Sequence, residues 1–292
     1  MTTATATVGC VIRRATPEDA AVCGRICYEA FATLNRKHNF PPDVPDQETG
    51  ARLMSWMFSH PGMYCVVAEV EGRIVGSNCL DERGIIAGIG PITIDPTSQD
   101  SGIGRTLMVA VMERANERKA AGLRLVQAAF HGRSMSLYAK LGFDVREPLV
   151  VMQGAPLKRQ IDGYTVRPAT AIDVEDCRRL CLRVHGHERS EELRDGIAQG
   201  IAMAVERGGK LAGYTSALGF FGHAVAESNG PMQALIAGAE QFLGPGFLLP
   251  TRNTELFRWC LGHGLRVVEP MTLMAVGLYN EPVGAFLPSI LF

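Results

Sequence analysis

The sequence predicts an α/β protein (α+β in stricter usage) made of two tandem domains, each a mixed, largely antiparallel sheet flanked by helices. The first observation is a repeat, because Ile12-Arg13-Arg14-Ala15-Thr16 reappears as Val166-Arg167-Pro168-Ala169-Thr170. The offset of 154, the difference between 167 and 13, is kept by further pairs: Asp19 and Asp173, Cys23 and Cys177, Arg25 and Arg179, Cys27 and Cys181. The second observation is the order of elements in each copy, in which hairpins precede one β-α-β crossover.

The first domain, residues 10–155, is predicted to open with a strand and two helices. Strand 10–15 ends at Thr16, whose Asp three positions later gives a capping-box-like start to helix 17–33. A proline-stiffened loop leads to helix 46–59, and the turn Glu71-Gly72 between two β-branched runs indicates a hairpin. The two strands of that hairpin are 63–70 and 73–81. The later elements are strand 85–95, helix 102–121, strand 123–130, helix 133–141 and strand 143–152.

The second domain, residues 160–292, follows a polar linker near Gly154 to Gly163 and has the same order of elements. Thr170 and Asp173 repeat the helix start of the first domain. The predicted elements are strand 164–168, helices 171–184 and 190–199, strands 201–206, 210–219 and 221–227, helix 231–242, strand 246–250, helix 252–262 and strand 265–277.

The composition provides material for packed cores and argues against several partners. Of 292 residues, 47% are hydrophobic and 20% are charged, and the net charge is −1. A near-neutral chain lacks the basic footprint of a nucleic-acid or anionic-membrane binder, so neither partner is expected. Residues 1–7 have no signal-peptide pattern, and no run approaches the 18 apolar residues of a membrane helix. We therefore expect a frayed start on a cytoplasmic protein.

The eight cysteines are spread along a core-rich chain, which favours free thiols over a disulfide framework. Cys23 with Cys27, and Cys177 with Cys181, are one helical turn apart, a spacing that suits a metal only if other ligands converge. No His or Cys cluster completes either pair, so we predict packing and no metal site.

The segment Gln99-Asp100-Ser101-Gly102-Ile103-Gly104 lies between an apolar strand-like run and a helix-like run. A glycine-rich turn at a helix start lets backbone N–H groups converge on one anion, with the helix dipole behind them. The turn lacks the three glycines of the dinucleotide-binding pattern and the Gly-Lys-Ser/Thr of a Walker A loop. A different phosphate ligand is predicted.

This Q-x-x-G-x-G turn, followed by Leu137-Tyr138-Ala139-Lys140-Leu141-Gly142-Phe143, resembles the GNAT superfamily of N-acetyltransferases. A helix and a strand separate the two motifs, as in that family. The resemblance covers residues 11 to about 155 and implies acetyl-CoA as co-substrate, with direct transfer of the acetyl group to an amine in a ternary complex.

The resemblance also implies the site residues. Tyr138 matches the general acid that protonates the coenzyme thiolate, and Ile92, Thr93 and Ile94 match the strand whose N–H groups bind pantetheine and the thioester oxygen. His131 stands where the family commonly has Asn, and the resemblance implies that it donates to the pantetheine or acts as a base. Asp100-Ser101 replaces the usual Gly or basic residue. The pyrophosphate contacts carry over to Gln99, Gly102, Ile103, Gly104, Arg105 and Thr106.

The general base is less defined, and Asp81 and Glu82, in the turn after the third strand, are the candidates on the acceptor side. Acidic residues in a hairpin turn are also commonly just solvated. The loop 34–46 carries Arg36, Lys37, His38 and Phe40, which suit an anionic or aromatic acceptor or simply an exposed polar loop.

The second copy is interpreted as degenerate, because Glu227-Ser228-Asn229-Gly230-Pro231 lacks the paired glycines and the leading Gln. Aligning Gly142 with Gly264, an offset of 122, places Cys260 opposite Tyr138 and Asn253 opposite His131. The expected function is therefore an N-acetyltransferase acting on a small-molecule or peptide amine. The alternatives are a non-catalytic acyl-CoA sensor and a ligand-free interaction scaffold; the acceptor and the oligomeric state, a homo-oligomer included, stay open.

Overall fold

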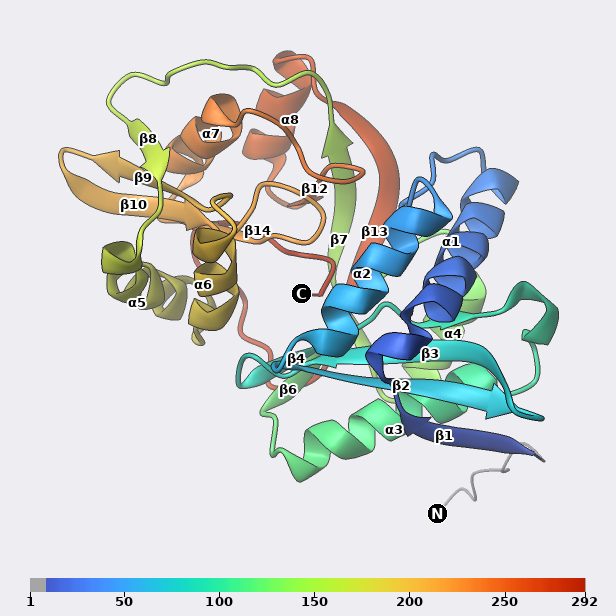
Figure 1. The fold of residues 1–292 in the computed structure, drawn as a ribbon. Helices are drawn as coiled ribbons and strands as arrows, with labels where there is room; N and C mark the ends of the chain where they lie inside the picture. The colour runs from blue at the N-terminus through green and yellow to red at the C-terminus, as the bar shows by residue number, and fades with distance from the viewer. Residues whose placement is uncertain (1–8, 292) are drawn as a thin grey trace. The chain divides into compact units, whose positions relative to one another are not determined.

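The computed structural model describes residues 9–291, which form two compact units (Figure 1). The first unit comprises the chain up to Glu82 together with Ala87–Leu123, and the second comprises Arg83–Ile86 together with the chain from Arg124 onward. The expectation for residues 1–7 lies outside the described residues. None of the helices within 9–291 is long and apolar enough to cross a membrane.

The first unit is an antiparallel sheet with three helices. The strand order is β1-β2-β3-β4, and the short β5 pairs with β3. Its elements are β1 (Cys10–Arg14), α1 (Ala20–Lys37), α2 (Gln47–Ser59), β2 (Met63–Val70), β3 (Arg73–Asp81), β4 (Ile86–Ile89), β5 (Thr93–Ile94) and α3 (Ile103–Glu117).

Helices α1 and α2 approach each other closely because both carry glycine at the contact. A Cβ on Gly24 would lie 2.3 Å from the backbone nitrogen of Ala51, and one on Gly50 would lie 2.5 Å from the carbonyl oxygen of Gly24. Real Cβ atoms do not reach such distances, so the contact requires glycine at both positions.

The second unit holds the rest of the chain. Its elements are β6 (Gly122–Ala128), α4 (Gly132–Lys140), β7 (Asp144–Gln153), β8 (Thr165–Pro168), α5 (Val174–His185), α6 (Ser190–Ala198), β9 (Met203–Arg207), β10 (Lys210–Thr215), β11 (Ala224–Ala226), α7 (Asn229–Gly238), β12 (Phe247–Pro250), α8 (Thr254–Gly262), β13 (Arg266–Gly277) and β14 (Ala285–Leu287). One set of strands runs β6-β13-β7-β12, and a separate five-stranded sheet runs β14-β11-β10-β9-β8.

The predicted repeat has a physical counterpart at the two helix starts. Arg13 donates two hydrogen bonds to Asp19, at 2.7 and 2.9 Å, and a third to Glu69 at 2.9 Å. Arg167 does the same with Asp173, at 2.9 and 2.7 Å, and with Glu206 at 2.8 Å. In both copies the aspartate also accepts from the backbone of the preceding Thr, which completes the predicted capping box.

The two copies exchange their last strands. Strand β7, which ends the first copy, lies between β13 and β12 of the second, with Leu149 opposite both Met271 and Pro250. Strand β13 in turn lies next to β6 of the first copy, and Ala129 N–H donates to the carbonyl of Pro270 at 3.1 Å. Figure 1 shows β7 in green beside the long red β13. The boundary between 155 and 160 stays a prediction, since strands of both copies interleave on either side of it.

Several predicted elements have different bounds. Predicted strand 85–95 is broken into β4 and β5, because Pro91 and Ile92 together stand opposite the single residue Asn78 of β3 and form a bulge. Pro91 has no N–H to donate to a ladder. Predicted helix 231–242 occupies Asn229–Gly238, predicted strand 221–227 shortens to Ala224–Ala226, and β14 was not predicted.

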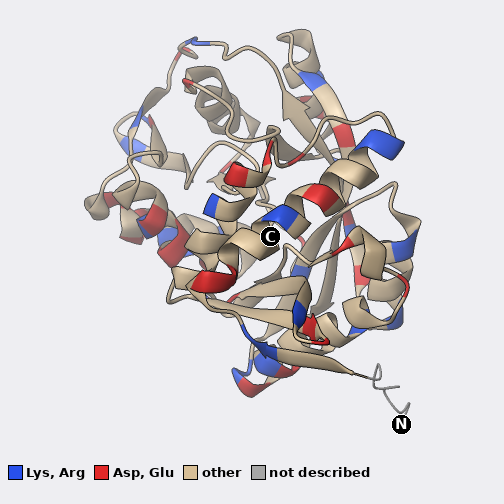
Figure 2. Ribbon diagram, turned by 45° about the vertical axis from the view of Figure 1, so that its right-hand side comes forward, with Lys and Arg blue, Asp and Glu red and all other residues tan. Residues whose placement is uncertain are grey.

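Charged residues of both signs are mixed along the ribbon (Figure 2). Many form short-range pairs on one helix face, such as Arg25 with Glu29 at 2.7 Å and Arg178 with Glu175 at 2.9 Å. Such exposed pairs contribute little to stability, because water screens the attraction between their charges.

Candidate acyl-CoA and catalytic site

The predicted phosphate cradle lies in the first unit, between β5 and α3. Asp95 closes the preceding turn by accepting from the N–H and hydroxyl of Thr97, at 3.0 and 2.7 Å. Asp100 has φ 65° and Gly102 has φ 84°, so the chain twice enters the left-handed region before the helix begins. Gly102 is the N-cap of α3, and glycine adopts this conformation without strain.

The first turn of α3 presents free donors. The N–H groups of Ile103, Gly104 and Arg105 precede the first intrahelical bond, which Thr106 N–H makes to the carbonyl of Gly102 at 3.2 Å. These donors and the dipole of a 15-residue helix fit a pyrophosphate. Gln99 is half-buried beside the turn, and Asp100 is exposed, so water screens its repulsion of an anion.

The bulged strand offers the second set of predicted donors. Asp95 N–H donates to the carbonyl of Val75, and Thr93 stands opposite Ser77 with its hydroxyl 3.3 Å from that of the serine. Because N–H groups alternate between the two edges of a strand, that of Ile94 points away from β3. Ile92 lies in the bulge, where this alternation is interrupted, so its role as a donor stays a prediction.

The two acidic candidates differ from the expectation of a solvated turn. Asp81 is the last residue of β3 and is only 7% exposed. The Glu82 carboxylate accepts from Arg114 of α3, from Nε at 2.7 Å and from a terminal nitrogen at 3.2 Å. Asp81 and Glu82 both stay candidates for the base. Nothing local in the sequence indicates the partner Arg114, 32 residues away.

In the second unit, Tyr138 is fixed by the end of helix α4. Phe143 N–H donates to the carbonyl of Tyr138 at 3.0 Å and Gly142 N–H to that of Ala139 at 3.1 Å, with Gly142 at φ 95°. This is a Schellman motif, and the edge-to-face contact of Tyr138 with Phe143, 6.3 Å between ring centroids, is its hydrophobic part. Burial raises the pKa of the Tyr138 phenol well above its ordinary value, so the phenol is protonated at neutral pH.

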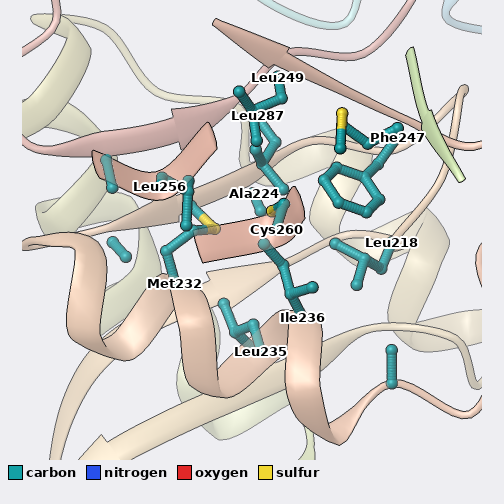
Figure 3. Close-up of a cluster of buried hydrophobic side chains, with 14 of the residues drawn as sticks. Leu218, Ala224, Met232, Leu235, Ile236, Phe247, Leu249, Leu256, Cys260 and Leu287 are labelled. Atoms are coloured by element: carbon teal, nitrogen blue, oxygen red, sulfur yellow. The ribbon is translucent and has the colours of Figure 1, made fainter. Parts of the chain in front are cut away.

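The second copy repeats this helix end with different chemistry. Gly264 has φ 84°, and Leu265 N–H donates to the carbonyl of Cys260 at 3.1 Å, so Cys260 occupies the position of Tyr138. Figure 3 shows Cys260 among buried apolar side chains that include Ile236 and Leu256. Burial raises the pKa of its thiol to about 12, which describes an inert packing residue.

The residues aligned with His131 are helix N-caps in both copies. His131 precedes α4, and Asn253 precedes α8 and accepts from Leu256 N–H at 3.2 Å. In both copies the N-cap therefore stands seven residues before the position of Tyr138 or Cys260, and the length of the helix sets this spacing. His131 is half-buried, and its backbone carbonyl accepts from Met135 N–H at 3.2 Å.

The start of α7, where a second cradle would be expected, is filled. A Cβ on Gly230 would lie 2.4 Å from the hydroxyl of Tyr164. Asn229 donates to the carboxylate of Glu255 at 3.0 Å and accepts from Asn253 at 2.8 Å. At this helix start, Tyr164 occupies the space that a phosphate would need, and the Glu255 carboxylate would repel the phosphate charge.

The cysteine pairs are buried and all eight cysteines are free thiols. Across the described chain, 9–291, no group of three or more His, Cys, Asp or Glu side chains is arranged to hold a metal ion.

Comparisons with known proteins agree with this geometry. Residues 29–143, which span the cradle and the Tyr138 motif, match the model of the acetyltransferase (GNAT) family. A search of curated proteins finds no match.

Three solved structures are similar over nearly the whole chain. A putative acetyltransferase from Pyrococcus horikoshii superposes with a TM-score of 0.74 at 20% identity, covering 96% of this chain and 93% of that one. A GCN5-related N-acetyltransferase from Sphaerobacter thermophilus gives 0.61 at 13% identity, covering 94% and 97%. A tandem GNAT protein from the clavulanic acid biosynthesis pathway gives 0.55 at 15% identity, covering 92% and 98%.

The fold is thus that of a tandem acetyltransferase, with sheets flanked by helices as the sequence predicted. The family match covers residues 29–143, so this segment is identified as an acetyltransferase (GNAT) domain.

Proposed function

We propose that the chain transfers an acetyl group from acetyl-CoA to an amine of a small molecule or peptide, by direct attack in a ternary complex. The observation that supports this best is that one copy keeps both a glycine-capped helix start and Tyr138 at the helix end, while the other copy has a filled helix start and Cys260 at the corresponding helix end. A sensor that only binds acyl-CoA has no use for the acid.

In the proposed reaction, backbone N–H groups of the α3 start bind the pyrophosphate, and those of Ile92 and Ile94 bind the pantetheine and the thioester oxygen. The amine nitrogen attacks the thioester carbon, and the tetrahedral intermediate expels the coenzyme thiolate. Tyr138 gives its phenolic proton to that sulfur, and Asp81 or Glu82 accepts the proton that the amine loses.

We also propose a cytoplasmic location. All eight cysteines are free thiols, and the cytoplasm is a compartment where thiols stay reduced. The acceptor enters as a neutral amine.

The experiment is a screen of an amine library with a free-thiol assay for coenzyme A release, followed by Tyr138→Phe. The variant is expected to lower kcat by roughly 10²–10⁴-fold with acetyl-CoA affinity nearly intact, because the ring and its packing remain. Tyr164→Phe, in the filled second copy, is the matched control and should turn over normally. Wild-type turnover by Tyr138→Phe would remove the assigned acid, and tight acetyl-CoA binding with no amine acetylated would favour the sensor.

A further inference from the structure

Two arginines and a tyrosine meet at one end of the sheet in the second unit. Arg124 is the third residue of β6, Arg146 is the third residue of β7, and Tyr279 follows the end of β13, the strand that lies between them. The guanidinium carbons of Arg124 and Arg146 lie 4.8 and 5.3 Å from the centroid of the Tyr279 ring. Both distances are within cation–π range, so two positive charges are gathered at one aromatic ring.

The positive charge of this cluster is partly withdrawn from water. The Arg124 side chain is buried, at 1% exposure. Burial, together with the positive charges of Arg189 and Arg146, lowers the pKa of Arg124 from 12.5 to about 10, so this residue stays cationic at neutral pH. Arg189 pairs with Glu192. Like charges that face one another away from water cost free energy, and an anion bound among them would relieve that cost.

The carboxylates near the cluster are engaged elsewhere or exposed. Glu147 accepts two hydrogen bonds from Arg252, at 3.0 and 2.6 Å, and Glu281 accepts one from the same guanidinium at 2.8 Å. Asp144 accepts from a terminal nitrogen of Arg146 at 2.9 Å, but the Asp144 side chain is 69% exposed. Water screens the charge of such an exposed carboxylate, so Asp144 only weakly offsets the positive charge around Tyr279.

Two hydrogen-bond donors of the cluster are buried and unsatisfied. The hydroxyl of Tyr279 and the Nε atom of Arg146 are both buried, and neither has a hydrogen-bond partner among residues 9–291. Each of these groups has one hydrogen to donate. Native structures seldom leave buried donors unpaired, and a bound ion or molecule accounts for such cases. Because the donors lie among cations, the partner that suits them is an anion with acceptor oxygens.

The surroundings favour an organic monoanion over phosphate. The Tyr279 ring packs against an apolar cluster that includes Leu149, Phe220 and Leu273, which offers contacts to the carbon atoms of a ligand. The Arg146 side chain is 33% exposed, so the cluster can be reached from solvent. Moving a doubly charged phosphate out of water costs more than moving a carboxylate. The two oxygens of a carboxylate also match a planar guanidinium with a neighbouring hydroxyl.

We propose that Arg124, Arg146 and Tyr279 form a binding site for the carboxylate group of a small organic molecule. The Tyr279 hydroxyl and Arg146 Nε donate to the carboxylate oxygens, and Arg124 adds positive charge at the same ring. The site lies wholly within the second unit and goes beyond the proposed acetyl transfer, because binding there needs no acetyl-CoA. The carboxylate belongs either to the acceptor amine or to a separate effector, and the chemistry of recognition is the same for both.

The test starts with the thermal midpoint of the wild type in acetate, benzoate, succinate and the common amino acids, each matched to sodium chloride at equal ionic strength. Calorimetry then gives the Kd of the carboxylate that stabilises most. Tyr279→Phe keeps the ring and removes the hydroxyl, and Arg146→Gln removes the charge. Asp144→Asn is the matched control, because it breaks the same ion pair as Arg146→Gln but leaves the guanidinium in place. Tyr164→Phe controls for the loss of a tyrosine hydroxyl elsewhere in the unit.

Tyr279→Phe and Arg146→Gln should each raise the Kd about tenfold or more, since each removes a hydrogen bond to a charged group. Asp144→Asn should bind at least as tightly as the wild type, and Tyr164→Phe should bind equally. Without ligand, the thermal midpoint of Tyr279→Phe should not fall, because the hydroxyl it removes has no partner within the described chain. This midpoint separates lost binding from lost folding.

The proposal is overturned if no carboxylate stabilises the protein beyond sodium chloride, if Tyr279→Phe and Arg146→Gln bind as the wild type does, or if inorganic phosphate binds more tightly than every carboxylate. The source of the carboxylate is then found by competition. An acceptor amine that carries it should displace the bound carboxylate, and its methyl ester should not, whereas an effector should bind together with the amine. These binding measurements need no catalysis, so they stand even if the wild type acetylates no amine and the proposed function fails.

Discussion

The duplicated Arg–Asp–Glu network predicts a specific dependence of stability on pH. Hydrogen bonding to Arg13 lowers the pKa of Asp19 from 3.8 to about 2, and Arg167 does the same for Asp173. Both carboxylates are buried, at 8% and 9% exposure. Since one pKa unit corresponds to about 1.4 kcal/mol, each contributes about 2 kcal/mol to the free energy of unfolding.

The sign follows from the direction of the shift. Because the folded-state pKa is depressed, the stabilisation is complete above the unfolded value near 4 and is lost as pH falls through about 2. Asp19→Asn and Asp173→Asn should each lose about 2 kcal/mol at pH 6 and differ little from wild type near pH 2.

Urea unfolding followed by circular dichroism between pH 2 and 7 measures this, with the exposed Asp162→Asn as control. The control should track wild type at every pH. A constant difference between Asp19→Asn and wild type across the range would refute the ionic origin of the stabilisation.

Three further outcomes follow from packing. Gly24→Ala should destabilise by about 1–3 kcal/mol, because its Cβ would overlap Ala51, and an unchanged thermal midpoint would contradict the close helix contact. Cys260→Ser should leave kcat unchanged and lower the thermal midpoint, because it puts a hydroxyl in an apolar cluster; a loss of kcat without a loss of stability would give Cys260 a catalytic role. A fragment ending at Gly154 should be insoluble, because β7 would lose both of its neighbours, and a soluble, fully active fragment would rule out the strand exchange.

Local features of the fold and of the site were predictable from the sequence because single residues dictate them. The Gly102 turn, the Thr16–Asp19 capping box and the Gly142 helix end each need a particular backbone conformation or side chain at one position. The position of Tyr138 near a helix end was predictable from the same glycine, Gly142.

Long-range pairing was not predictable in this way. The residue patterns of β7 and β13 indicate strands but carry no information about which strand is the neighbour. The exchange of last strands between the two copies was therefore not predicted. One signal was available, because Glu147-Pro148 and Glu269-Pro270 repeat at the offset of 122 that relates Gly142 to Gly264. The ion pair of Arg83 with Asp195 links residues 112 positions apart and leaves no local trace in either segment.

We expect acetyl-CoA to bind this chain at the start of α3 alone. Calorimetric titration of coenzyme A into wild type, Gly104→Val and Gly262→Ala tests it directly. The last substitution lies in the second copy, where a Cβ meets nothing within 4 Å. We predict one coenzyme A per chain, an affinity about tenfold or more weaker for Gly104→Val because its side chain obstructs the approach of phosphate to the backbone, and no change for Gly262→Ala. Two coenzymes per chain, or unchanged affinity in Gly104→Val, would contradict the account.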